Sequence, residues 1–191
     1  MSRDVLVLLS GGLDSTVCAE MARRRERLHT LLHVQYGQAN AEQEMIASGA
    51  WARSHSLTRE LVQCPIRADE LGIGIGKPGA RVVPGRNLAL LAVAANRAAA
   101  VGCREVWIGC NADDAADYPD CRFEFLQSAA ALIMASAGVD VSAPLLGKTK
   151  AEVIDLAKHY GIDIGATWSC YEPNSGKPCG TCNACRLRAG S

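Results

Sequence analysis

The sequence predicts an α/β protein with a Rossmann-like parallel sheet and helices on both faces. Short apolar runs alternate with segments of helical periodicity through most of the chain, and this alternation is typical of parallel βαβ units. The first apolar run, Val5 to Leu9, breaks at two glycines and continues as a helical pattern from Thr16. A glycine turn therefore lies between a strand end and a helix start, as in nucleotide-binding α/β folds.

Composition limits the classes of protein that the chain can be. Its 191 residues, 49% of them apolar and 21% charged, fit one soluble domain with its own core. The net charge of zero argues against stable nucleic-acid binding, which usually requires a basic excess. Arg3 and Asp4 precede a strand-length run rather than a signal peptide, and no apolar stretch reaches membrane-spanning length. We therefore expect a cytoplasmic enzyme with no membrane partner.

The remaining elements follow from periodicity and from start and stop signals. Further strands are expected at residues 28–34, 57–63, 104–109 and 140–143. Helices are expected up to about Arg25, after Asn40, from Val83 to Val101, up to about Ala137, and from Thr149 to Tyr160. Two sequences, Asn40 with Gln43 and Thr149 with Glu152, match the capping-box pattern.

Two segments depart from this alternation. Residues 67–83 are rich in glycine and predict a mobile flap, because a loop of that length in a compact domain is often functional. From Thr167 the alternation ends, so we expect two units: an α/β domain over residues 1–166 and a small segment, 167–191, packed on it.

The turn Ser10-Gly11-Gly12-Leu13-Asp14-Ser15 predicts a phosphate site. Unpaired N–H groups and the helix dipole favour an anion at a helix start, and glycine lets the backbone approach closely. The alternative is an ordinary strand-to-helix turn with Asp14 or Ser15 as N-cap. The order is neither a Walker loop nor the G-x-G-x-x-G of dinucleotide-binding folds. It resembles the signature of the PP-loop ATP pyrophosphatases.

Four cysteines near the C-terminus predict a metal site. Cys179-x-x-Cys182-x-x-Cys185 with Cys170 upstream suits tetrahedral zinc, and four protein ligands favour a structural site. An iron–sulfur cluster and free or disulfide-paired cysteines remain as alternatives. The other cysteines are expected to be small core residues, except Cys121, which lies among polar residues.

Several motifs occur in one order along nearly the whole chain. Besides the Ser10 loop and the cysteines, they are Tyr36-Gly37-Gln38, Val83-Pro84-Gly85-Arg86-Asn87, Tyr118-Pro119-Asp120-Cys121-Arg122, Lys148-Thr149 and Thr167-Trp168-Ser169-Cys170-Tyr171. Together they resemble the QueC family, the 7-cyano-7-deazaguanine (preQ0) synthases. This resemblance implies an adenine nucleotide alpha-hydrolase-like fold and an ATP- and zinc-dependent carbon–nitrogen ligase of queuosine biosynthesis.

The activity implied by the resemblance converts 7-carboxy-7-deazaguanine and ammonia to the nitrile through adenylated and amide intermediates. ATP would lie on the loop and the first helix: Leu9, Ser10, Gly11, Gly12, Leu13, Asp14, Ser15, Thr16, Val17, Cys18 and Ala19. Structural zinc would lie at Cys170, Cys179, Cys182 and Cys185. Mg²⁺ would screen the phosphates, with Asp14 nearby. Members of this family usually form dimers, so a homodimer is consistent with the resemblance.

Other residues are candidates for catalysis and substrate binding. Arg86 and Arg122 are expected to pair with phosphate or with the substrate carboxylate, the alternative being surface salt bridges. Tyr36 and Tyr118 could stack on the flat base or could be packing residues. Gln38 and Asn111 follow strand ends, where ligands bind in parallel sheets. Asp113, Asp117 and Asp120 could read the guanine edge, the alternative being turn formation.

The chain departs from the family pattern at three places. Asn40 stands where the family usually has His, the flap is shorter than usual, and the chain ends soon after Cys185. These departures leave open the identity of the amine. A QueC-like ligase that joins the deazaguanine carboxylate to another amine, perhaps on a protein, is the nearest alternative. A PP-loop tRNA thiolase and a non-enzymatic zinc module are the others.

Overall fold

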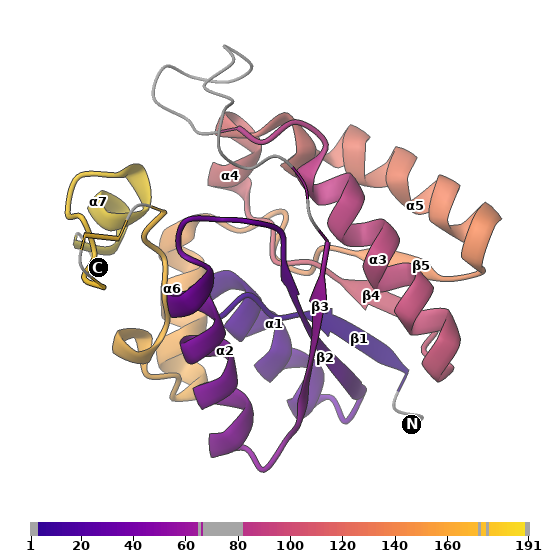
Figure 1. The fold of residues 1–191 in the computed structure, drawn as a ribbon, viewed down its shortest axis with the longest axis horizontal. Coiled ribbons are helices and arrows are strands. Elements are labelled where there is room, and N and C mark those ends of the chain that lie inside the picture. Colours follow the sequence, from indigo (N-terminus) through magenta and orange to yellow (C-terminus); the bar gives the residue numbers. More distant parts are fainter. Residues whose placement is uncertain (1–3, 65, 67–81, 172, 175, 190–191) are drawn as a thin grey trace.

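A computed structural model describes residues 4–64, 66, 82–171, 173–174 and 176–189. They form a five-stranded sheet in the order β3-β2-β1-β4-β5, in which every neighbouring pair is parallel (Figure 1). The strands are β1 (Val5–Leu8), β2 (Leu28–Gln35), β3 (Arg59–Gln63), β4 (Glu105–Trp107) and β5 (Asp140–Ser142). The predicted parallel sheet is confirmed, with β3 and β4 shorter than expected. The predicted flap lies outside the described residues from 67 to 81.

Helices cover both faces of the sheet, as the alternation predicted. They are α1 (Leu13–Arg24), α2 (Ala41–Ser54), α3 (Arg86–Val101), α4 (Ala112–Asp117), α5 (Phe123–Ala137), α6 (Lys150–Tyr160) and α7 (Asn183–Ala189). Short 3₁₀ turns occur at Pro119–Cys121 and Ile164–Ala166. None of the described helices is both long enough and apolar enough to cross a membrane.

The alternating side chains of β1 divide the core into two layers. Leu6 and Leu8 pack with α3 and α5, whereas Val5, Val7 and Leu9 pack with α1 and α6. Successive side chains of a strand point to opposite faces, so a strand that is apolar at every position must be covered on both sides. In Figure 1, α3 and α5 lie on one side of the sheet and α1, α2 and α6 on the other.

The helix starts differ in how they are capped. The Thr149 capping box is confirmed, because Thr149 and Glu152 each bond the other's backbone N–H. The Asn40 box is wrong: Asn40 makes no side-chain cap, and its amide instead donates to Glu44 and to the Cys170 carbonyl. The N-cap of α1 is Gly12, not Asp14 or Ser15. Asn111 and Asp114 form a capping box on α4 that the sequence did not predict.

The strand order places a crevice beside β1. The chain moves outward from β1 to β2 and β3, then returns to add β4 on the other side, and ligands bind where the order reverses in this way. At this point Gly109, just after β4, lies against the first turn of α1. A Cβ on Gly109 would come within 2.8 Å of the Ser15 nitrogen.

We therefore expect Gly109→Ala to lower the free energy of unfolding by roughly 1–3 kcal/mol, because backbone must shift to admit the methyl group. Urea denaturation measures the change. Gly147→Ala is the matched control, since nothing lies within 4 Å of a Cβ at that position. Equal stability of the two variants would contradict the close approach of β4 to α1.

Candidate active site

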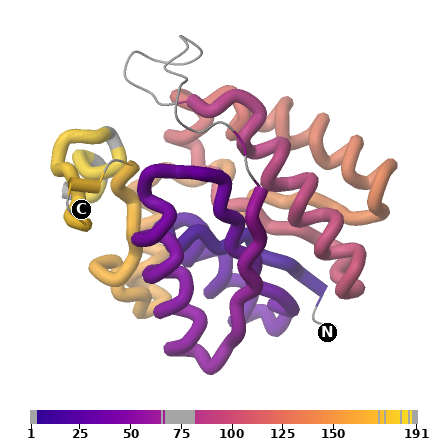
Figure 2. Tube along the Cα trace, viewed as in Figure 1, coloured from indigo at the N-terminus to yellow at the C-terminus, as the bar shows by residue number. Residues whose placement is uncertain are grey.

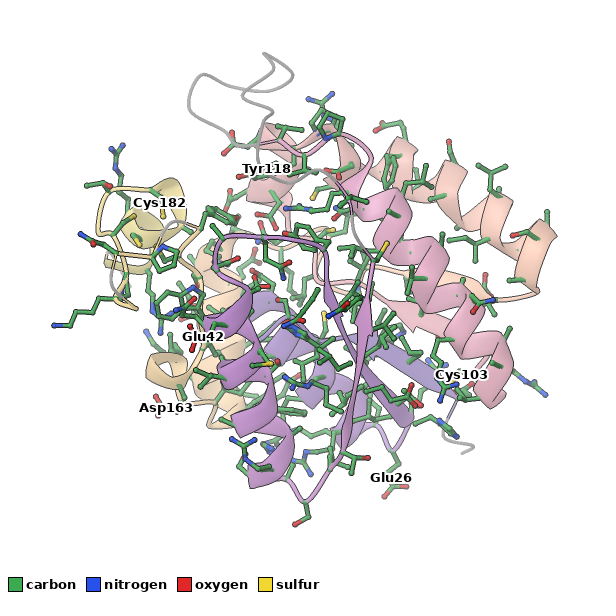
Figure 3. The ribbon with its side chains drawn as sticks, in the orientation of Figure 1. Glu26, Glu42, Cys103, Tyr118, Asp163 and Cys182 are labelled. Carbon is green, nitrogen blue, oxygen red and sulfur yellow. The ribbon has the colours of Figure 1, made fainter. Side chains whose placement is uncertain are left out.

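One cavity opens at the carboxyl ends of the central strands. Its lining comes from the turn Ser10 to Ser15, named the phosphate loop after its predicted role, and from the end of β4, the starts of α3 and α6, and the segment after Thr167. Figure 3 labels Tyr118, which is one of the lining residues. It also labels Cys182 in the C-terminal segment from Thr167 that carries four cysteines, the cysteine segment. Segments that are distant in sequence thus meet at the edge of the sheet where ligands are expected.

The phosphate loop is held in place by close backbone packing. Gly11 has a φ of +93°, and a Cβ there would lie 2.6 Å from the Ser48 nitrogen and 2.8 Å from the Glu44 carbonyl oxygen. Both the backbone conformation and the space require glycine. The loop therefore rests directly on the backbone of α2.

The loop leaves several donors free for an anion. The N–H group of Gly12 donates to Ser10 Oγ (3.2 Å), and Ser15 Oγ donates to the Gly12 carbonyl (2.9 Å). The loop N–H groups that donate to no described residue are those of Ser10, Gly11, Leu13, Asp14 and Ser15. Free N–H groups at a helix start favour a bound anion.

Asp14 connects the loop to two other elements. Its carboxylate accepts from Asn111 Nδ2 (3.1 Å) and from Lys150 Nζ (2.6 Å). Lys150 enters because the backbone N–H of Ala112 donates to the Lys148 carbonyl, which holds the start of α6 beside α4. Sequence reasoning gave Lys150 no role, although its place just after the Thr149 N-cap was a usable signal.

Arg86 contributes the second cationic side chain of the cavity. Its guanidinium lies over the Tyr118 ring, 5.9 Å from the centroid. Burial opposes the charge, but the oxygens of Tyr36 and Asp120 outweigh it and raise the pKa of Arg86. No carboxylate of the described residues forms an ion pair with Arg86. The raised pKa keeps the guanidinium charged, and Arg86 lines the cavity.

Asp120 and Asn87 fix the start of α3, which carries Arg86. The N–H group of Asn87 donates to Asp120 Oδ2 (3.1 Å), and Asn87 Nδ2 donates to the Asp120 carbonyl (2.9 Å). Asp120 does not line the cavity. This candidate substrate residue instead holds the start of α3 through Asn87.

Two further candidates also lie away from the cavity. Arg122 is exposed and donates from Nε to the Ala115 carbonyl (3.2 Å). Gln38 is buried, where its Oε1 accepts from the Tyr36 N–H and its Nε2 donates to Glu44. Gln38 therefore shapes the turn that carries Tyr36.

The other candidates meet at the cavity. Tyr36, Asn111, Asp113 and Tyr118 all line it. Of the residues predicted to hold ATP, those that line the cavity are Leu9, Ser10, Gly12, Leu13, Asp14 and Ser15. The next four residues of α1 are buried and do not line the cavity. Val17, Cys18 and Ala19 pack in the hydrophobic core, and Thr16 Oγ1 donates to the Gly12 carbonyl.

Two acidic residues that sequence reasoning missed also line the cavity. Burial, and then the nearby Asp14 carboxylate, raise the pKa of Asp114 to about 6. Burial likewise raises the pKa of Glu44, whose oxygens accept from Gln38 and Asn40. Both carboxyl groups depend on neighbours from other elements, which no local sequence pattern shows.

The four C-terminal cysteines converge. The sulfur atoms of Cys170, Cys179, Cys182 and Cys185 all lie within 4.8 Å of one another. A tetrahedral zinc–thiolate site, with Zn–S distances of about 2.3 Å, has edges of about 3.8 Å, so the arrangement fits such an ion. The N–H groups of Cys179 and Cys182 donate to Cys170 Sγ (3.2 Å) and Cys179 Sγ (3.3 Å), which favours thiolates.

The cysteine segment packs against the phosphate loop. The Trp168 N–H donates to the Gly11 carbonyl (2.8 Å), and Asn40 Nδ2 donates to the Cys170 carbonyl (3.0 Å). Figure 2 shows this C-terminal segment beside the start of α2. Arg188, which lines the cavity, donates to the carbonyls of Thr167 and Ile164.

Comparisons with known proteins point to one family. The model of the family described as "Queuosine biosynthesis protein QueC" matches residues 4–191. A relative named 7-cyano-7-deazaguanine synthase, from Anaeromyxobacter sp. (strain Fw109-5), is 36% identical over 217 residues, covering 98% of this chain and 90% of the relative. The match therefore extends over nearly the full length of both proteins.

Solved structures share the fold at low identity. A predicted subunit of tRNA methyltransferase from Methanocaldococcus jannaschii has a TM-score of 0.57 at 19% identity, covering 83% of this chain and 76% of that one. NMN synthetase from Francisella tularensis has a TM-score of 0.54 at 18% identity, covering 95% and 70%. These structures support the Rossmann-like architecture.

Proposed function

The chain belongs to the QueC family of queuosine biosynthesis proteins, and from that membership we propose that it is a 7-cyano-7-deazaguanine synthase. The enzyme uses ATP to convert 7-carboxy-7-deazaguanine and ammonia to the nitrile through an adenylate and an amide. The observation that carries the proposal is the phosphate loop, whose free N–H groups lie beside Lys150 and Arg86 in one cavity.

The residues of the cavity fit the activation of a carboxylate. A carboxylate is a poor electrophile, and transfer of AMP from ATP gives it a good leaving group. The loop N–H groups and Ser10 would hold the phosphates, while Lys150 and Arg86 offset their charge. Ammonia then attacks the adenylate to give the amide, and activation of the amide oxygen by a second ATP permits dehydration to the nitrile. The protein positions these groups and excludes water.

Asp14 is the carboxylate on the phosphate loop and is the expected contact for Mg²⁺. When bound there, Mg²⁺ would screen the phosphate oxygens. Lys150 Nζ, 2.6 Å from Asp14 Oδ2, already shows that this carboxylate faces a cation. Asn111 holds the other oxygen, so the carboxylate is oriented before any ligand arrives.

We assign the deazaguanine to the part of the cavity lined by Tyr36, Tyr118 and Arg86. The two rings offer flat apolar surfaces for a base, and Arg86 offers a charged partner for the substrate carboxylate. Asp113 at the start of α4 lines the cavity and supplies a carboxylate acceptor for the guanine N–H groups.

Residues 1–166 form the ATP-binding unit in this proposal, and residues 167–191 form a zinc-binding segment packed on it. The hydrogen bonds of Trp168 with Gly11 and of Cys170 with Asn40 support the packing of this segment on the ATP-binding unit. Bound zinc would stiffen a segment that has little core of its own. A homodimer stays a prediction.

Incubation of the protein with 7-carboxy-7-deazaguanine, ammonia and Mg-ATP tests the proposal, with products followed by mass spectrometry. The nitrile is expected, together with AMP and pyrophosphate. If the folded, metal-loaded protein forms neither amide nor nitrile, the proposal is wrong. If the amide is the end product, or if only another amine is accepted, the enzyme is a divergent ligase of the same family.

Arg86→Ala is expected to lower kcat/KM by roughly 10–100-fold, because a charged hydrogen-bonding partner of the anion is lost. Arg122→Ala is the matched control, and its activity should stay within about threefold of the parent, since Arg122 is exposed and does not line the cavity. Steady-state kinetics measure both variants. Equal losses of kcat/KM in the two variants would contradict the role assigned to Arg86 in the cavity.

Metal analysis of the purified protein tests the cysteine site. About one zinc per chain is expected, and Cys182→Ser should remove most of it, because a structural site needs all four ligands. Cys64→Ser is the control, as this thiol lies outside the cluster. Iron together with sulfide in the parent protein would contradict zinc, and metal content unaffected by Cys182→Ser would contradict the site.

A further inference from the structure

A buried histidine lies directly beneath the phosphate loop. His33 is on β2, is 0% exposed, and does not line the cavity. Its Nδ1 lies 3.0 Å from the carbonyl oxygen of Leu9, the residue that precedes the loop. His33 therefore reaches across from the neighbouring strand to the point where the chain leaves β1.

The tautomer of His33 follows from its partners. A carbonyl oxygen only accepts, so Nδ1 must carry the proton in order to bond with Leu9. Ser48 Oγ, 3.2 Å from the same nitrogen, donates its own proton to the Glu44 carbonyl (2.6 Å) and accepts from Arg59. The Ser48 oxygen is thus a second acceptor for the same N–H group. Burial lowers the pKa of His33, which is consistent with a neutral ring.

The second ring nitrogen of His33 shows that packing alone does not explain the residue. Nε2 is buried and has no hydrogen-bond partner among the described residues. An apolar side chain of similar size would leave no such atom unsatisfied. The hydrogen bond from Nδ1 is thus the contribution that distinguishes histidine at this position.

The peptide that joins Leu9 to Ser10 is held at its carbonyl, and the peptide before it is held at its N–H. The Leu9 N–H donates to the Leu32 carbonyl (2.8 Å), and the Leu9 carbonyl accepts from His33. In a trans peptide the carbonyl and the next N–H point in opposite directions, and the described residues contain no cis peptide. With the Leu9 carbonyl held toward β2, the Ser10 N–H must point away from His33.

We propose that His33 is a positioning residue of the ATP site, which orients the Leu9–Ser10 peptide so that the Ser10 N–H is directed at a phosphate. Ser10 lines the cavity, and its N–H donates to no described residue, so the donor is available. The inference rests on the proposed use of ATP by this loop. It adds a residue that touches no ligand and acts only through the backbone.

Titration calorimetry with Mg-ATP tests the proposal on the full chain. His33→Leu is expected to weaken ATP binding by about tenfold, the factor that corresponds to the loss of one hydrogen bond. His33→Asn should restore binding to within about threefold of the parent, because its amide can donate from near the position of Nδ1. His33→Gln, which places its amide nearer to the position of Nε2, should resemble His33→Leu.

If His33→Leu fails to fold, the ATP affinities of His33→Asn and His33→Gln can still be compared. Both side chains are polar amides, and they differ only in length and so in the position of the donor. His29→Leu, an exposed histidine on the same strand, is the control and should bind ATP like the parent. Equal affinity of the Asn and Gln variants would overturn the positioning role. Failure of the parent to bind Mg-ATP would instead refute the proposed function on which the role depends.

The kinetic signature separates positioning from a general loss of structure. At saturating ATP, kcat of His33→Leu should stay within about threefold of the parent, while KM for ATP rises by about tenfold. A fall in kcat with KM for ATP unchanged would contradict the proposal, because the hydrogen bond would then act on the chemical step rather than on phosphate binding.

Discussion

The backbone contact between Gly11 and α2 is the constraint on which the site depends. No side-chain atom fits between the phosphate loop and the Glu44–Ser48 turn, so the loop takes its shape from a helix that is remote from it in sequence. On the other side of the loop, Gly109 gives β4 the same close approach to α1. These two glycines allow three elements to meet within van der Waals contact at the switch point of the sheet.

The same helix connects the phosphate loop to the cysteine segment. Asn40, at the start of α2, donates to both Glu44 and the Cys170 carbonyl, and it is almost fully buried. The backbone N–H of Trp168 also donates to the Gly11 carbonyl, so the cysteine segment contacts the phosphate loop directly. The proposed metal at the cysteines would therefore stabilise the segment that packs against the loop, a segment that has little core of its own.

Charge in the cavity is concentrated although the chain as a whole is neutral. Lys150 and Arg86 are near the loop, and Asp14, Asp114 and Glu44 line the same space. Burial raises the pKa of both Asp114 and Glu44, and the Asp14 carboxylate adds to the effect at Asp114. Lys150 and Arg86 thus lie in a cavity with carboxylates that neighbouring side chains hold by hydrogen bonds.

The parallel sheet, the glycine turn before α1, the group of four cysteines and the family could all be predicted from the sequence, because each follows from a pattern of apolar runs, glycines or cysteine spacing. Which polar residues face the cavity depends on packing between distant elements, so it is seen only in the folded protein. Arg86 and Arg122 look equivalent in sequence. In the structure, the hydrogen bonds between Asn87 and Asp120 hold the start of α3, so that Arg86 lines the cavity, whereas Arg122 is exposed. Lys150 and His33 act across strands and helices, through contacts that no sequence spacing encodes, since packing between distant elements sets them.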